Sequence, residues 1–231
     1  MIRAVLFDVG GPLDLETAHE AAIDTDIRAA RQREGFAVDE AAWHAANAFA
    51  VSSFAPSVYK AVIWRLTGGD PAASERAYAW VEERGHSRDL FELRSGIPDI
   101  LEALTQRGLK LGLAANQPLT TLERLARHGI GHYFENQGIS AIYGFRKPDV
   151  RLFLRACEDL GVAPEECVMV GDRIDNDIVP AKLLGMRTVR IRSGRHASQE
   201  PRSWDEAPDA EAADAAGILA AIEAILDLPG R

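Results

Sequence analysis

The fold is restricted most by an alternation of short apolar runs with helical segments after Ser95. Runs of strand length are Lys110–Leu113, Gly138–Ile142, Cys167–Val170 and Thr188–Ile191. The segments between them carry apolar residues at helical spacing and end at glycines. Strands that alternate with helices form a parallel sheet through right-handed crossovers. The sequence therefore predicts an α/β domain with a parallel sheet.

Both ends of the chain extend this pattern. Ile2–Phe7 is rich in apolar residues and predicts a further strand, buried on both faces of the sheet. Residues 192–214 are polar and acidic and contain two prolines, which indicates a surface loop. A last amphipathic helix is expected to follow, with Ile218, Ile222 and Ile225 on its apolar face.

Residues 16–94 have a different character. Apolar residues recur there only at helical spacing, as in the stripe Ile23, Ile27 and Ala30, and no strand pattern interrupts them. About eighty residues of this kind are enough for a small helical bundle. We therefore predict two domains: an α/β core made of residues 1–15 and 95–231, and an inserted helical domain made of residues 16–94.

Composition restricts the partners and the location. The formal net charge of the 231 residues is −9, which argues against general binding to nucleic acids or to anionic membranes. Cys157 and Cys167 have no metal-binding spacing, and two cysteines do not make a disulfide framework. The first residues do not resemble a signal peptide, and no apolar run reaches membrane-spanning length. A small-molecule substrate and a reducing, cytoplasmic location are expected.

Reactive residues follow three of the predicted strands. Asp8 follows the first strand, Asn116 follows Lys110–Leu113, and Asp172 and Asp177 follow Cys167–Val170. Ligands of open parallel sheets bind at the carboxyl ends of the strands, so these side chains are expected to converge. Clustered carboxylates need a positive partner, and Mg²⁺ prefers such oxygen ligands. Lys147 precedes a proline and is therefore expected in a nearby loop.

Four stretches of the chain resemble the haloacid dehalogenase-like hydrolase superfamily, in its branch with a helical cap inserted after the first motif. They are "LFDVGGPL", "AANQ", "FRKPDVRLF" and "VGDRIDNDIVPAKLLGM", in the family's order. The resemblance implies a Rossmann-like core and a mobile helical cap. It also implies hydrolysis of a small phosphorylated metabolite through an aspartyl phosphate on a nucleophilic aspartate.

The resemblance assigns roles residue by residue. Asp8 and Lys147 are the implied catalytic residues, and Lys147 either neutralises a substrate anion or holds the nucleophile. The implied metal-site residues for Mg²⁺ are Asp8, the backbone carbonyl of Gly10, Asp172 and Asp177, of which Asp177 supports the metal or the lysine. Gly11 and Asn116 are the implied substrate-binding residues, although Asn116 also fits a turn before Pro118.

Three residues depart from the pattern of family phosphatases. Gly10 stands where these enzymes carry an aspartate that protonates the leaving group and then activates water. Loss of such a group costs about 10²–10⁴-fold in rate. Pro12 replaces a threonine or valine, and Ala115 replaces a hydroxyl residue that holds a phosphoryl oxygen. A slow phosphatase is therefore expected.

Two alternatives stay open at this point. A 2-haloacid dehalogenase expels halide, which needs no proton, so Gly10 is compatible with that reaction. A non-catalytic member of the fold that binds a ligand or a partner is compatible with all three departures. Asp172 and Asp177 are also compatible with a purely structural role at a helix start. Asp14 and Glu16 are candidates for the missing acid, but their position favours a solvated hinge.

Overall fold

The computed structural model describes residues 1–37, 39–85 and 89–228. The chain divides into two compact units. The core unit consists of Met1–Leu15 and the chain from Glu92 onward, and the helical unit is Glu16–Phe91. The helical unit ends three residues before the predicted boundary at residue 94, because Glu92 and Arg94 form backbone hydrogen bonds with Leu15 and Leu13.

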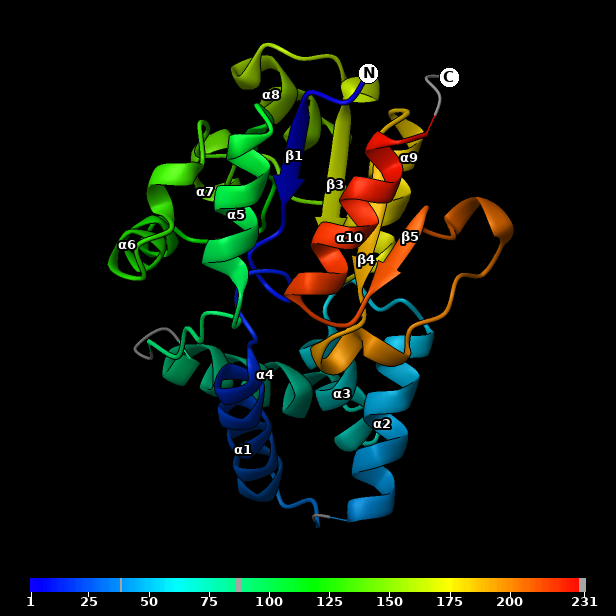
Figure 1. The fold of residues 1–231 in the computed structure, drawn as a ribbon. Coiled ribbons are helices and arrows are strands. Elements are labelled where there is room, and N and C mark those ends of the chain that lie inside the picture. Colours follow the sequence, from blue (N-terminus) through cyan, green and yellow to red (C-terminus); the bar gives the residue numbers. More distant parts are fainter. Residues whose placement is uncertain (38, 86–88, 229–231) are drawn as a thin grey trace. The chain divides into compact units, whose positions relative to one another are not determined.

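A parallel sheet forms the centre of the core unit, as the sequence predicts (Figure 1). Its strand order is β2-β1-β3-β4-β5. The strands are β1 (Ala4–Phe7), β2 (Lys110–Leu113), β3 (Cys167–Gly171), β4 (Arg187–Ile191) and β5 (Ala210–Ala212). Because β1 lies between β2 and β3, the residues that follow these three strands meet at one edge of the sheet.

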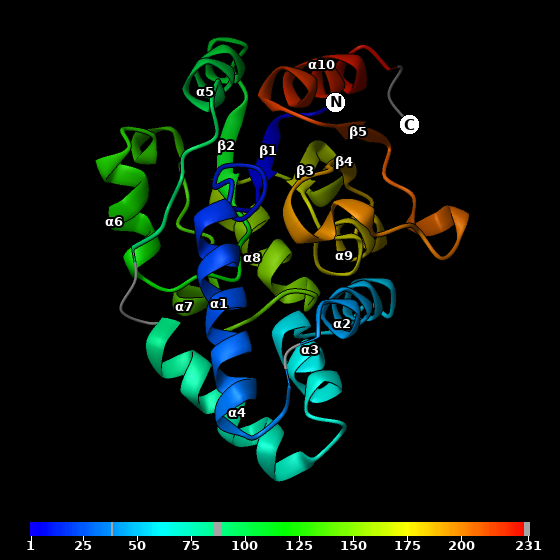
Figure 2. The same cartoon turned by 90° about the horizontal axis from the view of Figure 1, so that it is seen from below.

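Helices cover both faces of this sheet (Figure 2). One face carries α5 (Ile97–Gln106) and α10 (Ala215–Leu226), and the other carries α8 (Val150–Leu160) and α9 (Val179–Leu183). Two further helices, α6 (Thr120–Arg127) and α7 (Ser140–Tyr143), lie beyond β2. The Rossmann-like α/β class is confirmed.

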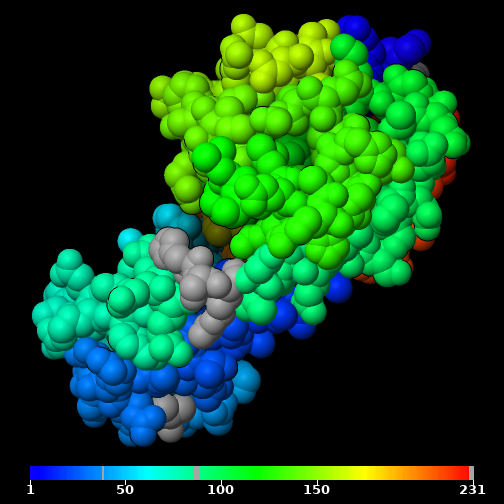
Figure 3. Space-filling view, turned by 90° about the vertical axis from the view of Figure 1, so that its left-hand side faces the viewer, coloured from blue at the N-terminus to red at the C-terminus, as the bar shows by residue number. Residues whose placement is uncertain are grey.

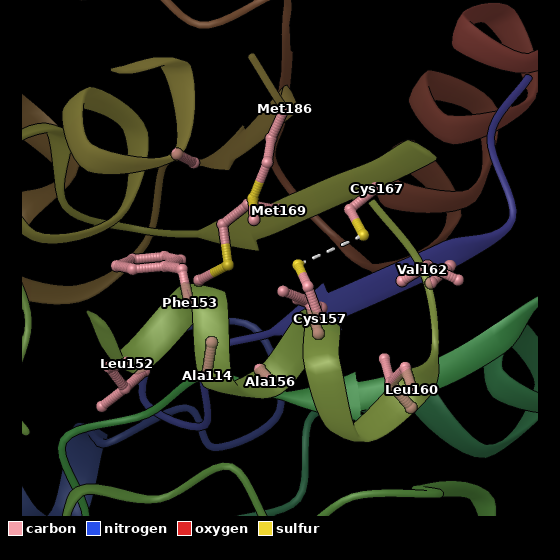
Figure 4. Close-up of a cluster of buried hydrophobic side chains, with 13 residues drawn as sticks. Ala114, Leu152, Phe153, Ala156, Cys157, Leu160, Val162, Cys167, Met169 and Met186 are labelled. Carbon is pink, nitrogen blue, oxygen red and sulfur yellow. Dashed lines mark hydrogen bonds between the residues drawn. The ribbon is translucent and has the colours of Figure 1, made fainter. Parts of the chain in front are cut away.

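The α8 face contains a buried apolar cluster (Figure 4). Phe153 and Ala156 of α8 pack there with Met169 of β3, and all three are fully buried. Cys157 and Cys167 lie in the same cluster as free thiols, with their sulfurs 3.6 Å apart. This packing fixes α8 on β3, and therefore fixes the loop before α8 relative to the residues after β3.

The predicted strand at Gly138–Ile142 is wrong. Only Ile139 forms an isolated bridge, to Ala115, and the following residues form α7. Gly138 lies so close to the end of β2 that a Cβ atom there would be 1.7 Å from the Leu113 carbonyl oxygen. The segment therefore meets β2 at the separate parallel bridges Leu111–Phe134 and Ala115–Ile139 and does not form a continuous strand.

The segment before Gly138 also covers the edge strand β2. The Glu135 amide donates to the Leu111 carbonyl at 2.8 Å, so this edge is not open to pairing with another chain. Figure 3 shows this side of the core unit, whose surface is formed largely by the green segments around α5, α6 and α7.

Residues 192–214 are not only a surface loop, because they contain β5. The pairs Val189–Ala210 and Ile191–Ala212 add β5 to β4, and Asp209 accepts hydrogen bonds from the backbone and hydroxyl of Thr188 at 2.9 Å. The strand has three residues and an exposed glutamate at its centre, so it has little apolar signal.

In its described residues, 16–37, 39–85 and 89–91, the helical unit contains the helices α1 (Thr17–Arg33), α2 (Glu40–Ser52), α3 (Val58–Leu66) and α4 (Pro71–Gly85). Asp39 accepts hydrogen bonds from the first amides of α2, and Ser57 caps α3. Their inward faces form one apolar cluster that contains Ile27, Trp43 and Val62. No helix in the described part of the chain is long and apolar enough to span a membrane.

Candidate active site

Asp8 stands at the end of β1, where the sheet stops. Its amide donates to the Val170 carbonyl of β3 at 2.8 Å, which continues the strand pairing by one residue. Its carboxylate oxygen Oδ1 accepts a hydrogen bond from the Val9 amide at 2.8 Å. The side chain keeps 13% of its surface exposed, so one part of the carboxylate remains open to an incoming group.

Lys147 joins two of the carboxylates. Its Nζ atom lies 2.9 Å from Asp8 Oδ1 and 2.6 Å from Asp177 Oδ1, and its side chain is 1% exposed. An ammonium group in this position neutralises charge and orients both acids through charge-assisted hydrogen bonds. The loop position predicted from Pro148 is correct, and Lys147 contacts the nucleophile candidate directly.

Burial and charge together set the protonation of this pair. Burial raises the pKa of the Asp8 carboxyl to about 6; Lys147 opposes this rise, and the charge of Asp177 adds to it. Burial by itself would lower the pKa of the Lys147 ammonium, but the charges of Asp177 and Asp8 outweigh burial and raise it. Lys147 therefore stays charged and favours the ionised form of Asp8.

Asp177 is fully buried and fixed from three sides. Its Oδ2 atom accepts from the Arg173 amide at 3.0 Å, while Oδ1 contacts Lys147. A Cβ atom on Gly171 would lie 2.4 Å from the Asp177 side chain, so only glycine fits at the end of β3. Asp177 lies in a π-helical turn, Ile174–Ile178, that precedes α9.

Asn116 is bound to the backbone of Lys147. The Lys147 amide donates to Asn116 Oδ1 at 2.7 Å, and Asn116 Nδ2 donates to the Lys147 carbonyl at 3.0 Å. This pair of bonds holds the lysine loop against the end of β2. This pair uses Oδ1 and one of the two N–H groups of Nδ2, so the second N–H is not required for holding the loop.

The loop after Asp8 turns back beside Asp172. Gly11 has a φ of +81°, and a Cβ atom there would lie 2.7 Å from Asp172 Cβ. The Gly11 amide donates to the Asp14 carbonyl at 2.9 Å. A glycine is therefore required both by the backbone conformation and by the close approach of Asp172.

Asp14 lies at the end of the first core segment. Its Oδ1 atom accepts from the Glu92 amide at 2.9 Å, where the chain returns from the helical unit. The other candidate for the missing acid, Glu16, belongs to the helical unit. Ala115 uses its amide and its carbonyl for bonds to Gly138 and Ser140, and its side chain is fully buried.

Sequence reasoning missed three buried polar residues behind the site. Arg94 donates to the Gly11 carbonyl, Arg190 donates to the Asp172 carbonyl at 3.1 Å, and Gln199 accepts from the Ile174 amide at 2.8 Å. Each is less than 10% exposed. For Arg190 the sequence carries a signal, because an arginine interrupts the apolar run of β4.

The carboxylate cluster fits a magnesium ion. One oxygen from each of Asp8, Asp172 and Asp177 lies within 4.8 Å of the others, and Asp172 and Asp177 are buried. Lys147 supplies one positive charge beside three carboxylates. Hard oxygen donors with surplus negative charge are what Mg²⁺ requires, and it fills its remaining positions with water or phosphate oxygens.

This fold and this site together define a class of enzyme. A parallel α/β sheet with a partly exposed aspartate after its first strand, a lysine bound to it, and acidic residues after a neighbouring strand suits covalent catalysis on an anionic substrate. The model of the haloacid dehalogenase-like hydrolase family matches residues 2–185. The chain belongs to this family.

Comparison with characterised proteins narrows the activity. The chain is 35% identical to the glyceraldehyde 3-phosphate phosphatase of Methanopyrus kandleri over 223 residues, which covers 91% of this chain and 93% of that protein. It is 33% identical to the phosphoserine phosphatase of Thermus thermophilus, over 70% of this chain and 62% of that protein. The crystal structure of a HAD phosphatase from Thermococcus onnurineus superimposes with a TM-score of 0.62 at 25% identity and covers 100% of both chains.

These relatives are phosphatases, which favours the predicted phosphatase over the dehalogenase. The chain is a hydrolase that acts as a phosphatase on a small phosphorylated metabolite. The non-catalytic alternative is correspondingly less favoured, although the three departures at Gly10, Pro12 and Ala115 remain features of this chain.

Proposed function

We propose that this protein is a Mg²⁺-dependent phosphatase in which Asp8 is the nucleophile. The observation that carries the proposal is the contact of Lys147 with both Asp8 and Asp177, beside Asp172. A carboxylate oxygen of Asp8 attacks phosphorus, a bond from that oxygen to phosphorus forms, and the bond to the leaving oxygen breaks. Water then hydrolyses the aspartyl phosphate and releases inorganic phosphate.

The residues around Asp8 support each part of this reaction. Lys147 keeps the attacking carboxylate ionised and oriented, and Asp177 fixes Lys147. The carboxylates of Asp8 and Asp172 and the backbone carbonyl of Gly10 would hold Mg²⁺, with Asp177 in support. When bound, the ion would supply positive charge for the phosphoryl oxygens. Gly11 and Asn116 are proposed to line the phosphate position.

The relatives suggest a substrate with a short carbon chain. Their names contain glyceraldehyde 3-phosphate and phosphoserine, which are three-carbon phosphomonoesters. We propose the same class here, in the cytoplasm; the free thiols of Cys157 and Cys167 are consistent with a reducing location. Phosphate release from glyceraldehyde 3-phosphate, phosphoserine, sugar phosphates and nucleotides, with and without Mg²⁺, tests the proposal. Release from none of them would contradict it.

The helical unit is proposed to act as a mobile cap. It is an insertion that the chain enters after Leu15 and leaves before Glu92, and its described helices have an apolar core of their own. We expect the distance between the two units, measured by small-angle scattering, to shorten when a phosphate analogue and Mg²⁺ are added. An identical scattering profile in both conditions would count against a closing cap.

Asp172→Asn is expected to weaken Mg²⁺ binding by at least 10-fold. The substitution keeps the size of the side chain and removes the charge of a proposed metal ligand. Isothermal titration calorimetry of the purified chain, without substrate, measures the affinity. Asp205→Asn is the matched control, because Asp205 is exposed and lies outside the site, and its Mg²⁺ affinity should equal that of the wild type. Equal affinity in Asp172→Asn and wild type would remove Asp172 from the metal site.

Gly10→Asp is expected to raise the turnover of alkyl phosphates more than that of p-nitrophenyl phosphate. The new carboxyl group can protonate a poor leaving group, whereas p-nitrophenolate needs little protonation. The upper limit is the general-acid factor of about 10²–10⁴, and Pro12 and Ala115 should keep the gain below it. The positive φ of this loop belongs to Gly11, so backbone strain does not oppose a side chain at Gly10.

The ratio of the two rates decides this prediction. It should rise in Gly10→Asp, while Mg²⁺ affinity and thermal stability stay close to those of the wild type. An unchanged ratio in a folded variant that binds Mg²⁺ would mean that the acid function at this position is not what limits the wild-type enzyme.

A further inference from the structure

Arg94 is a buried cation at the point where the chain re-enters the core. It is 7% exposed, and its amide donates to the Leu13 carbonyl at 2.8 Å. Its guanidinium group points to the loop after Asp8, where Nε and Nη2 donate to the Gly11 carbonyl at 3.0 and 2.6 Å. The same Nη2 atom donates to Ser193 Oγ at 2.6 Å. Two nitrogens of the charged Arg94 guanidinium group thus donate to the same backbone carbonyl, that of Gly11.

The carbonyl that Arg94 binds belongs to a short loop whose internal hydrogen bonds run from the Gly11 amide to the Asp14 carbonyl and from the Leu13 and Asp14 amides to the Val9 carbonyl. Gly10 and Gly11 are adjacent, and glycine loses more conformational freedom on folding than any other residue. The residue after Gly11 is Pro12, which has no amide hydrogen to donate. Two N–H donors from a guanidinium group on a single oxygen make a strong, charge-assisted contact. Arg94 therefore fixes the orientation of the peptide that follows Gly11.

Arg94 also connects the loop after β1 with the residue Ser193 after β4, although β1 and β4 are not adjacent strands. Ser193 lies just after β4, whereas Gly11 lies after β1, and β3 separates these two strands in the sheet. Between them lies Asp172, whose side chain is in close contact with the Gly11 position and whose carbonyl accepts from Arg190 of β4. Arg94 and Arg190 thus bind the backbone of two segments that carry residues of the proposed metal site.

We infer that Arg94 is a positioning residue of the phosphatase site. It holds the Gly10–Gly11 backbone so that the Gly10 carbonyl and the Asp8 carboxylate keep the arrangement that Mg²⁺ and phosphate require. It acts through the peptide of Gly11 and does not take part in bond making. This inference rests on the proposed function, because the proposed function makes the Gly10 carbonyl a ligand of Mg²⁺.

Two other roles for Arg94 make different predictions. A purely structural arginine would affect stability, with no separate effect on metal binding or turnover. A substrate-binding arginine would mainly affect KM for the phosphoester. Replacement of a positioning residue should lower Mg²⁺ affinity and kcat and leave KM within about threefold. It should also loosen the loop when no metal is bound.

The test uses the full chain with Arg94→Met, Arg94→Lys and Ser193→Ala. Arg187→Met is the matched control, because Arg187 is a partly buried arginine of β4 that pairs with Asp209 at 2.9 Å, away from the site. We expect Arg94→Met to lower kcat for p-nitrophenyl phosphate and Mg²⁺ affinity by about 10–100-fold each, as supporting residues of metal sites do. Arg94→Lys should recover most of this loss, because an ammonium group can still donate to the Gly11 carbonyl.

Amide hydrogen exchange supplies a readout that needs neither metal nor substrate. Exchange of residues 9–14 should accelerate in Arg94→Met and, to a smaller extent, in Ser193→Ala, and it should be unchanged in Arg187→Met. If Arg94→Met does not fold, Arg94→Lys and Ser193→Ala still test the inference, since both should show intermediate exchange and intermediate Mg²⁺ affinity.

The outcomes separate this inference from the proposed function. An active, Mg²⁺-binding wild type in which the Arg94 variants match Arg187→Met would overturn the positioning role alone. A raised KM with unchanged kcat and unchanged exchange would make Arg94 a substrate ligand instead. A wild type that neither binds Mg²⁺ nor releases phosphate would overturn the proposed function and this inference together.

Discussion

Replacement of Asp8 by asparagine is expected to lower phosphate release by about 10⁴-fold or more, as loss of a catalytic nucleophile does elsewhere. The amide keeps the size of the side chain, but it is not a nucleophile for phosphorus. It also gives Lys147 a neutral partner in place of a carboxylate at 2.9 Å. Steady-state phosphate release with p-nitrophenyl phosphate measures the loss.

Trapping of the intermediate makes this prediction specific to covalent catalysis. Acid quenching of the wild type during turnover should give a chain that is heavier by one phosphoryl group, with the modification on Asp8, and the Asp8→Asn variant should give none. A trapped phosphoryl group on another residue, or full activity in Asp8→Asn, would refute the assignment of the nucleophile.

Asp14→Asn is the matched control for Asp8→Asn. Asp14 is an aspartate of the same loop, and an asparagine there can still accept the hydrogen bond from the Glu92 amide. Activity should stay within a few-fold of the wild type. A loss of 100-fold or more, largest for alkyl phosphates, would instead identify Asp14 as the acid that Gly10 does not provide.

The sequence predicted the strand ends of the core well, because their signals are local. Each apolar run that proved to be a strand is followed within three residues by a polar residue, and the parallel order brings Asp8, Asp172 and Asp177 together. The contact of Lys147 with Asp8 and Asp177 was not predicted in detail, because it depends on how the loop before α8 is held by Asn116. That pairing joins residues 31 positions apart.

The errors come from short segments whose structure is set by distant contacts. Gly138–Ile142 has a strand-like composition, yet it pairs with the β2 side only at the isolated Ala115–Ile139 bridge, and α7 begins at the next residue. In β5, pairing with β4 overrides a polar sequence. Arg94 carries no sequence signal of its role, since its partners Gly11 and Ser193 lie 83 and 99 residues away.

Replacement of Lys147 by methionine is expected to destabilise the protein by about 3–5 kcal/mol and to abolish phosphate release. Removal of one partner from a buried ion pair leaves an uncompensated charge, and here it leaves two carboxylates, Asp8 and Asp177, of which Asp177 is fully buried. Urea unfolding measures the change in the free energy of unfolding. Lys110→Met is the matched control: Lys110 donates to the neutral Leu160 carbonyl at 2.6 Å, and its loss should cost about 1 kcal/mol.

A second substitution separates charge balance from catalysis at this position. In the double variant, which combines Lys147→Met with Asp177→Asn, Asp8 is the one member of the Asp8–Lys147–Asp177 group that keeps its charge. About 1–2 kcal/mol of the lost stability should therefore return. Activity should not return, because the nucleophile still lacks its ammonium partner. If the double variant is no more stable than Lys147→Met, the loss comes from packing and not from unpaired carboxylates. If Lys147→Met keeps its activity, the lysine serves the fold, and the ionised state of Asp8 depends on another positive group.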